Sequence, residues 1–147
     1  MHEELEGERT AVMGEQAGDG DPHLSKLAEV SRTMVRLYKD QFGRGPVKAR
    51  SNWAGTDILV CTLEESFTPA EKSLRQMGEH QRLRDVRMFF QYATVRDFVD
   101  PVERITGRTV RSFISGIDTE EDIAMETFVF YPRGSEGRSR ADKADVR

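Results

Sequence analysis

The sequence predicts an α+β domain in which two helix-and-hairpin units share one four-stranded antiparallel sheet. Three observations support this prediction. Apolar residues recur at helical spacing over residues 24–42, segments of strand character follow in two pairs, and the order of elements requires no parallel strand-helix-strand unit. An amphipathic helix must bury its apolar stripe, so we expect the helices to cover the sheet.

Length and composition limit the class of protein. The 147 residues suffice for one domain with a single core. With 37% hydrophobic and 33% charged residues, the composition is that of a soluble protein, and no stretch approaches the roughly 18 apolar residues of a membrane span. The one cysteine cannot form an internal disulfide, and residues 1–20 lack the apolar segment of a secretion signal. We therefore expect a cytoplasmic protein.

Charge divides the chain into three parts. Residues 1–22 hold seven acidic side chains and one arginine, residues 23–131 are balanced, and residues 132–147 hold five basic and three acidic side chains. This predicts a disordered acidic leader (1–22), a single α+β domain (23–131) and a disordered tail (132–147). Because the domain lacks the basic excess typical of nucleic-acid binding, we expect no nucleic-acid partner.

The first helix-and-hairpin unit has clear boundaries. Asp21 and Pro22 are typical of a helix start, and Gly43 is a typical helix stop. Residues 47–53 alternate in polarity and residues 58–63 are apolar on both faces, which predicts a hairpin whose second strand is the more buried. The apolar stripe of the helix consists of Leu24, Leu27, Ser31, Met34, Val35, Tyr38 and Phe42.

Helices connect this hairpin to a second one. A capping box from Thr68 to Glu71 opens a short helix that Gly78 interrupts, and a longer helix begins at about Glu79. The Asp100-Pro101 pair either kinks this helix or caps a new one, which stops at Gly107. Segments 108–117 and 123–131 are the third and fourth strands. The expected buried stripe of the longer helix is Leu83, Val86, Phe90 and Ala93.

Two stretches of the chain are similar to each other. The segment "FGRGPVKAR" (42–50) matches "ITGRTVRSF" (105–113), which aligns Gly43 with Gly107, and Asp57 aligns with Asp122 in the following turns. We interpret this as an internal repeat of one unit. Two such units can pair their apolar strands at the centre of a sheet with the strand order 1-2-4-3.

The repeated Gly-Arg pair has two interpretations. In the first, Arg44 and Arg108 lie near the last carbonyl groups of their helices, where positive charge is favoured, and basic residues on edge strands prevent aggregation. In the second, the two arginines form a paired site for an anion or an acidic partner. The candidate ligand-binding or partner-binding residues are Arg44, Lys48, Arg50, Arg108 and Arg111.

Other residues point to binding rather than to catalysis. Phe89, Phe90 and Tyr92 occupy more sides of a helix than one face needs, so we expect an exposed remainder that serves as a partner or dimer surface. Cys61 lies inside an apolar strand and is expected to be buried and inert. The three histidines have no ligand spacing. We therefore predict no enzyme activity, no metal site and no cofactor.

Four segments of the core carry a likeness to a known family: "LYKDQFGRGPVKAR" (37–50), "LEESFTPAEKSL" (63–74), "VERITGRTVRSFISGID" (102–118) and "FVFY" (128–131). Through them the core resembles the MpsC-like family, formerly a domain of unknown function. The resemblance implies a non-enzymatic accessory or regulatory subunit of a membrane system for cation-coupled transport or inorganic-carbon (bicarbonate) supply, named after a sodium-translocating, membrane-potential-generating system. It implies membrane transport proteins as partners and a location in the cytoplasm or at the inner face of the membrane. The exposed aromatic residues of the long helix would also suit a homodimer. The alternative is a cytoplasmic sensor of a small anion or nucleotide at Arg44 and Arg108.

Overall fold

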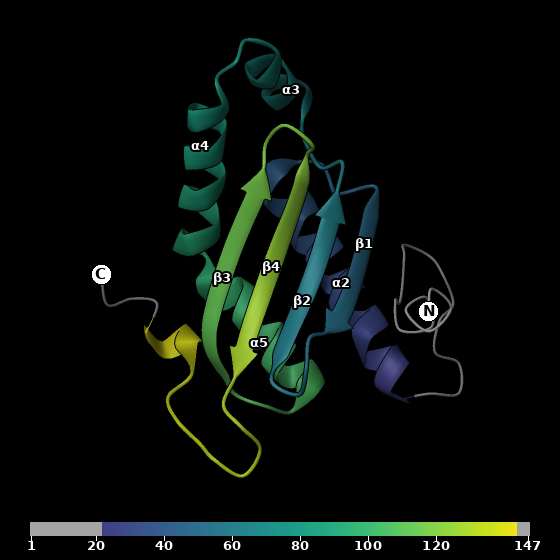
Figure 1. Cartoon of the computed structure of the whole chain (residues 1–147), viewed down its shortest axis with the longest axis vertical. Coiled ribbons are helices and arrows are strands. Elements are labelled where there is room, and N and C mark those ends of the chain that lie inside the picture. Colours follow the sequence, from purple (N-terminus) through teal and green to yellow (C-terminus); the bar gives the residue numbers. More distant parts are fainter. Residues whose placement is uncertain (1–21, 144–147) are drawn as a thin grey trace.

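The computed structural model describes residues 22–143 (Figure 1). Residues 1–21, which make up nearly all of the predicted leader, and residues 144–147 lie outside the described part, as does the predicted N-cap Asp21. The elements follow in the order α2 (Pro22–Phe42), β1 (Lys48–Trp53), β2 (Ile58–Glu64), α3 (Pro69–Gln76), α4 (His80–Ala93), α5 (Val95–Thr106), β3 (Val110–Asp118), β4 (Ile123–Phe130) and a short 3-10 helix η1 (Arg140–Lys143).

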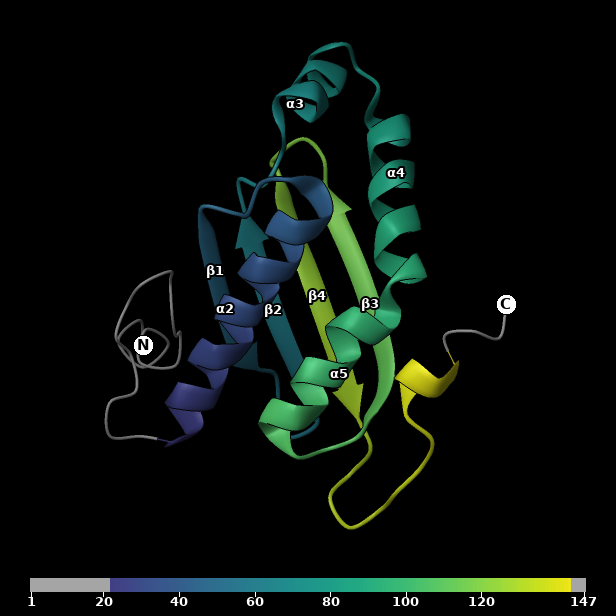
Figure 2. The ribbon, with the colours of Figure 1, turned by 180° about the vertical axis from the view of Figure 1, so that it is seen from behind.

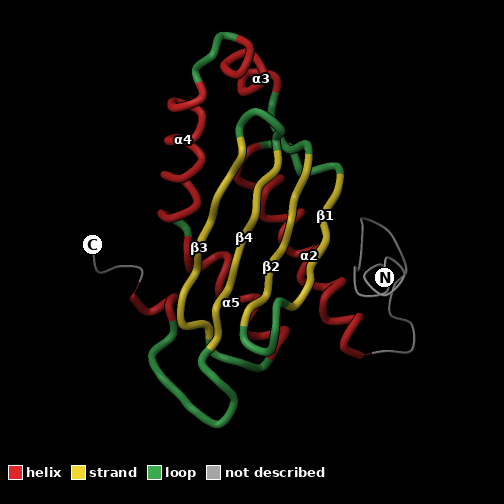
Figure 3. Tube along the Cα trace, viewed as in Figure 1, coloured by secondary structure: helices red, strands yellow, loops and turns green. Residues whose placement is uncertain are grey.

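The strands form one antiparallel sheet in the order β1-β2-β4-β3, which confirms the predicted topology. Helices α2 and α5 cross the same face of this sheet, as the view from behind shows (Figure 2). Helix α4 runs alongside β3, and α3 lies past the end of the sheet where the β3–β4 turn is found (Figure 3). The described part of the chain is therefore a two-layer α+β fold.

The core lies between the helices and the inward face of the sheet. Alternate residues of β2 and β4 are buried, as the period of two in a strand requires. Phe98 of α5 stacks on Phe113 of β3 with ring centroids 5.3 Å apart. The central members of this core are Leu27, Met34, Tyr38, Leu59, Cys61, Leu63, Phe98, Val99, Val102, Phe113 and Phe128.

The two helix-and-hairpin units have equivalent local geometry. Gly43 and Gly107 both adopt the left-handed conformation, with φ of 81° and 73°, and each donates its N–H to the carbonyl four residues earlier. The aligned aspartates also match, because the Asp57 carbonyl accepts from the N–H of Phe130 at 2.8 Å and the Asp122 carbonyl accepts from Glu65 at 3.0 Å. These contacts support the interpretation of an internal repeat.

The break in the second helical segment lies at Thr94, seven residues before Pro101. Helix α4 ends at Ala93, α5 starts at Val95, and Pro101 is inside α5. Thr94 makes the break: its backbone N–H and its hydroxyl both donate to the Phe90 carbonyl, and its hydroxyl accepts from Gln41 Nε2 at 2.8 Å. The helical break is thus held by a side-chain contact with α2. The Asp100-Pro101 pair neither starts a new helix nor breaks this one, since Pro101 lies inside α5.

The buried stripe of α4 also differs from the prediction. Leu83 is buried as expected, but Val86 and Phe90 are 46% and 43% exposed. Arg87 and Gln91 take the inward positions instead, one and two turns after Leu83. The prediction was wrong because it assigned apolar side chains to the inward face of α4. Polar side chains with hydrogen-bond partners occupy most of this face.

The segment after Pro132 has ordered parts. The 3-10 helix η1 buries Ala141, whose carbonyl accepts from Arg96 of α5 at 2.9 Å. Ser139 donates its hydroxyl to Glu103 of α5 at 2.8 Å. Between residues 22 and 143, no helix has the length and apolar character needed to cross a membrane.

The equivalent glycines generate a stability prediction. Gly107→Ala should lower the free energy of unfolding by about 1 to 2 kcal/mol, because an L side chain at a φ of 73° is strained although its Cβ would meet no atom within 4 Å. Urea unfolding measures the change. Gly116→Ala is the matched control, since its Cβ also meets open space but its φ is not left-handed; an equal loss of stability in both variants would contradict the assignment.

Candidate functional site

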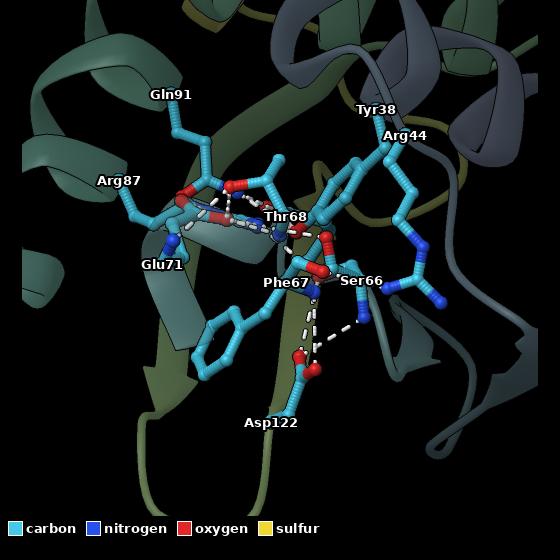
Figure 4. A network of polar contacts seen from close by, with 10 residues as sticks. Tyr38, Arg44, Ser66, Phe67, Thr68, Glu71, Arg87, Gln91 and Asp122 are labelled. Carbon is cyan, nitrogen blue, oxygen red and sulfur yellow. Dashed lines mark hydrogen bonds and ion pairs between the residues drawn. The ribbon is translucent and has the colours of Figure 1, made fainter. Parts of the chain in front are cut away.

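A cluster of polar side chains fills the space between α4, the end of α2 and the loop after β2 (Figure 4). Arg87, with no exposed surface, is its centre. We call this set the Arg87 cluster; its members are Tyr38, Ser66, Glu71, Arg87, Gln91 and Glu126.

The guanidinium of Arg87 has partners on each side. Its Nε and Nη2 donate to the two carboxylate oxygens of Glu71, each at 2.7 Å, which is a bidentate ion pair. Nη1 and Nη2 also donate to the hydroxyl and carbonyl of Ser66 at 3.2 and 3.1 Å. The Phe42 ring centroid lies 4.0 Å from Cζ, within cation–π range. A buried charge is costly unless it is paired in this way.

Glu71 connects this ion pair to the start of α3. Its Oε1 accepts from the N–H of Thr68, and the Thr68 hydroxyl accepts from the N–H of Glu71, which confirms the predicted capping box. Although burial raises the pKa of Glu71, hydrogen bonds from Arg87 and Thr68 lower it below its ordinary value overall. One carboxylate thus both caps a helix and neutralises a buried arginine.

Asp122 of the β3–β4 turn holds the loop that carries Ser66. Its two carboxylate oxygens accept from the backbone N–H groups of Ser66 and Phe67, each at 3.0 Å. Asp122 itself has a φ of 57°, a conformation that aspartate tolerates better than most residues. The turn of the second unit therefore fixes the exit loop of the first.

The inner end of the cluster contains a buried carboxyl group on β4. Glu126 Oε2 accepts from the Tyr38 hydroxyl at 2.5 Å and from Gln91 Nε2 at 2.6 Å. Gln91 Nε2 also reaches the Tyr38 oxygen at 2.8 Å. The second oxygen of Glu126 and the amide oxygen of Gln91 are buried and have no hydrogen-bond partner within the described residues.

Burial controls the protonation of this inner end. It raises the pKa of Glu126 to about 7, although the hydrogen bond from Tyr38, the neighbouring Ser115 hydroxyl and the charge of Arg87 act in the opposite direction. The Ser115 hydroxyl itself is buried and has no hydrogen-bond partner within the described residues. Burial, followed by the Glu126 charge, also raises the pKa of Tyr38 well above its usual range. Glu126 can thus exchange a proton near neutral pH.

Other titratable groups offer less chemistry. Cys61 is fully buried, and burial raises the pKa of its thiol to about 12, in agreement with the expectation of an inert thiol. Within residues 22–143, no three His, Cys, Asp or Glu side chains gather closely enough to hold a metal ion.

The two repeated arginines do not meet. The Nη1 of Arg44 donates to the Phe67 carbonyl at 2.6 Å, past the Glu64 end of β2. Arg108 lies at the Asp57 end of the same strand, where it contacts Thr56, Asp57 and Tyr131. A seven-residue strand spans roughly 20 Å, so no single small anion can bind both arginines. The first interpretation of the repeat placed both arginines near the last carbonyl groups of their helices. Their hydrogen-bond acceptors instead belong to residues outside these helices.

The other basic candidates are equally separated. Lys48 is exposed on edge strand β1, and Arg50 of the same strand pairs with Glu64 at 3.0 Å. Arg111 lies on the opposite edge strand, β3, with its Cζ 5.9 Å from the Tyr131 ring centroid. The structure therefore does not gather the five predicted basic residues into one site.

Two of the three aromatic candidates are exposed. Phe89 is 68% exposed and, with Val86 and Phe90, forms a stripe that we call the α4 apolar surface. Tyr92 is half-buried instead: its hydroxyl accepts from the N–H of Ser115 at 2.8 Å, and its ring packs against Phe113. The predicted partner surface thus loses Tyr92 and gains Val86.

Sequence reasoning missed most of the Arg87 cluster. A signal existed for Glu126, because alternation along β4 puts it on the same face as Ala124 and Phe128. Arg87 and Gln91 stand four and eight residues after Leu83, so they share its helix face. Because both side chains are polar, a search for apolar residues at helical spacing did not assign them to the buried face.

The fold and the site define the class of protein. It is a two-layer α+β domain built from two helix-and-hairpin units, with a polar cluster around a fully buried arginine. A family model described as "Na+-translocating membrane potential-generating system (MpsC)" matches residues 24–131. The chain therefore belongs to the MpsC family, whose name describes a component of such a system. Searches of curated proteins and of solved structures gave no match.

The bidentate ion pair predicts a large effect of truncation. Arg87→Ala should lower the free energy of unfolding by about 3 to 5 kcal/mol, because Glu71 would remain partly buried without its partner. Arg84→Ala, one turn earlier on the same helix and bonded only to Gln81 at 3.3 Å, should change it by less than about 0.5 kcal/mol. Urea unfolding of the two variants provides the comparison, and similar losses would be inconsistent with a central role for Arg87.

Glu126 predicts a pH dependence. A raised pKa means that the native state binds the proton more tightly than the unfolded state, so this group costs stability as the pH rises from about 4.5 to about 7. Relative to Glu126→Gln, which mimics the neutral form, the wild type should lose about 2 to 3 kcal/mol of unfolding free energy between pH 5 and pH 8. Urea unfolding at both pH values tests this; a constant difference between the two proteins would show that Glu126 titrates normally.

Proposed function

We propose that this protein is a non-enzymatic accessory or regulatory subunit of a membrane system for cation-coupled transport or bicarbonate supply, docked at the cytoplasmic face of the membrane through the α4 apolar surface. Membership of the MpsC family supports the kind of system. The exposed side chain of Phe89 is the observation that supports the α4 apolar surface as the docking surface. A phenylalanine that is 68% exposed beside two further exposed apolar residues is unusual outside interfaces.

The α4 apolar surface is suited to docking for a second reason. Arg87 and Gln91 anchor the opposite side of α4 through six hydrogen bonds to α2, α3, β4 and the loop after β2. A helix held in this way presents Val86 and Phe89 in a fixed orientation, which reduces the entropy lost on binding. Aromatic residues are also enriched at the centres of protein interfaces.

A sensor that binds one anion at Arg44 and Arg108 together receives no support from the geometry. The carbonyl groups of Phe67 and of Thr56 and Tyr131 already accept hydrogen bonds from these arginines, at opposite ends of β2. We therefore retain the accessory subunit as the functional proposal.

The proposal is tested in cells from which the gene has been deleted. The wild-type gene should restore a Na⁺-dependent membrane potential, whereas the double variant Val86→Ser/Phe89→Ser should restore less than half of it. The matched control is Val47→Ser/Ile114→Ser, which removes two apolar side chains of similar exposure, 48% and 54%, from other surfaces. Potential-sensitive dye fluorescence with and without Na⁺ gives the measurement.

A physical contact should accompany this effect. A photo-crosslinking amino acid at position 89 should form a covalent adduct with an integral membrane subunit of the transport system in native membranes, and one at position 114 should not. Equal complementation by both double variants would refute docking through α4. So would the absence of an adduct with a membrane subunit, or equal adduct formation from positions 89 and 114.

A further inference from the structure

A pocket of about 430 Å³ opens at the end of the molecule opposite the Arg87 cluster. It lies between the first turns of α2, the β1–β2 turn and the end of α5, close to the Asp57 end of β2. Its size falls in the usual range for small-molecule sites, roughly 300 to 1,000 Å³. The residues that line it are Lys26, Leu27, Val30, Trp53, Gly55, Thr56, Leu59, Thr106, Arg108 and Arg133.

Part of the pocket lining is apolar. Leu27, Val30 and Leu59 contribute to it and are themselves almost fully buried. The Trp53 ring, packed against Phe130 with centroids 5.5 Å apart, adds an aromatic wall. A planar ring or a short acyl chain could lose water-exposed surface here, whereas an inorganic ion could not.

The polar part of the pocket is cationic. Lys26, Arg108 and Arg133 line it, and among the described residues no acidic side chain does. Asp57, bonded to Arg108 Nη2 at 2.6 Å, offsets one of the three positive charges. Two positive charges therefore remain beside an apolar interior, which favours an anion.

Arg108 is already held in place. Its side chain is only 7% exposed and donates to the carbonyls of Thr56 and Tyr131 as well as to Asp57. Its Cζ lies 5.8 Å from the Trp53 ring centroid. These three acceptors use three of its five N–H donors, so Nε–H and one Nη1–H have no described partner. A ligand would meet a preorganised donor pair.

We propose that this pocket binds an amphiphilic organic anion, with a carboxylate or phosphate near Arg108, Lys26 and Arg133 and an aromatic or short acyl body against Trp53. The inference does not depend on docking through α4, because it uses a different surface. Each half of the ligand matches one half of the lining, and neither half alone would fill the site.

Trp53 provides the readout, since it is the only tryptophan in the chain. Phenyl phosphate and benzoate, titrated into the full-length protein, should change its fluorescence along a saturating curve and raise the melting temperature. Benzamide lacks the charge of benzoate, and inorganic phosphate lacks the ring of phenyl phosphate. Both should bind at least tenfold more weakly.

Charge-matched variants identify the site without disturbing Arg108. The double variant Lys26→Gln/Arg133→Gln removes two exposed cations from the lining and should weaken phenyl phosphate binding at least tenfold. Arg32→Gln/Lys72→Gln removes two exposed cations elsewhere and should bind as the wild type does. No saturable response to either anion, equal affinity for benzamide and benzoate, or equal weakening in both double variants would overturn the proposal.

Discussion

The helical layer of this protein is organised around a guanidinium group that has no access to water. An unpaired charge in such a place would cost several kcal/mol, so the surrounding chain must supply acceptors and ring faces. Arg87 obtains them from Glu71 at the start of α3, from Ser66 after β2 and from the Phe42 ring at the end of α2. Three segments that are separate in the sequence are therefore fixed to α4 by one side chain. The same requirement orients α4, because the side that carries Arg87 must face inward and the side that carries Phe89 must face outward.

The repeated unit shows how two equivalent ends of a sheet acquire different properties. Arg44 and Arg108 each bind the chain that leaves the second strand of their own hairpin, at the carbonyls of Phe67 and Tyr131. Beyond this shared contact the two ends diverge. At the Phe67 end, Asp122 and the Arg87 cluster fill the space with paired side chains. At the Tyr131 end, the Asp57 carboxylate pairs with Arg108. A pocket lined by basic side chains remains at this end.

Sequence patterns predicted the parts of the fold that follow from local chemistry. The helix stops at Gly43 and Gly107, the capping box at Thr68 and the strand order all agree with the structure, because backbone conformation and apolar alternation are encoded within a few residues. The interior face of α4 was not predictable in this way. Choosing Arg87 over Val86 requires knowing that Glu71, 16 residues away, reaches the same point in space. The break at Thr94 likewise involves Gln41 of α2, which is 53 residues away in the sequence. The sequence pattern pointed to Pro101 instead, because a proline is a local signal for a helix break and a contact between distant residues is not.

The chemistry of the cluster explains why polar residues are useful at these positions. A buried ion pair contributes little net stability compared with apolar residues of the same volume, because desolvation offsets most of the attraction. Its directional hydrogen bonds nevertheless allow one orientation of α4 only, since any rotation would leave the guanidinium and the Gln91 amide without acceptors. An apolar stripe would tolerate several neighbouring orientations, in which Phe89 and Val86 could turn back toward the core. The polar inward face of α4 therefore keeps Val86 and Phe89 exposed to water, which costs free energy. Binding of another protein surface over these two side chains would recover that free energy.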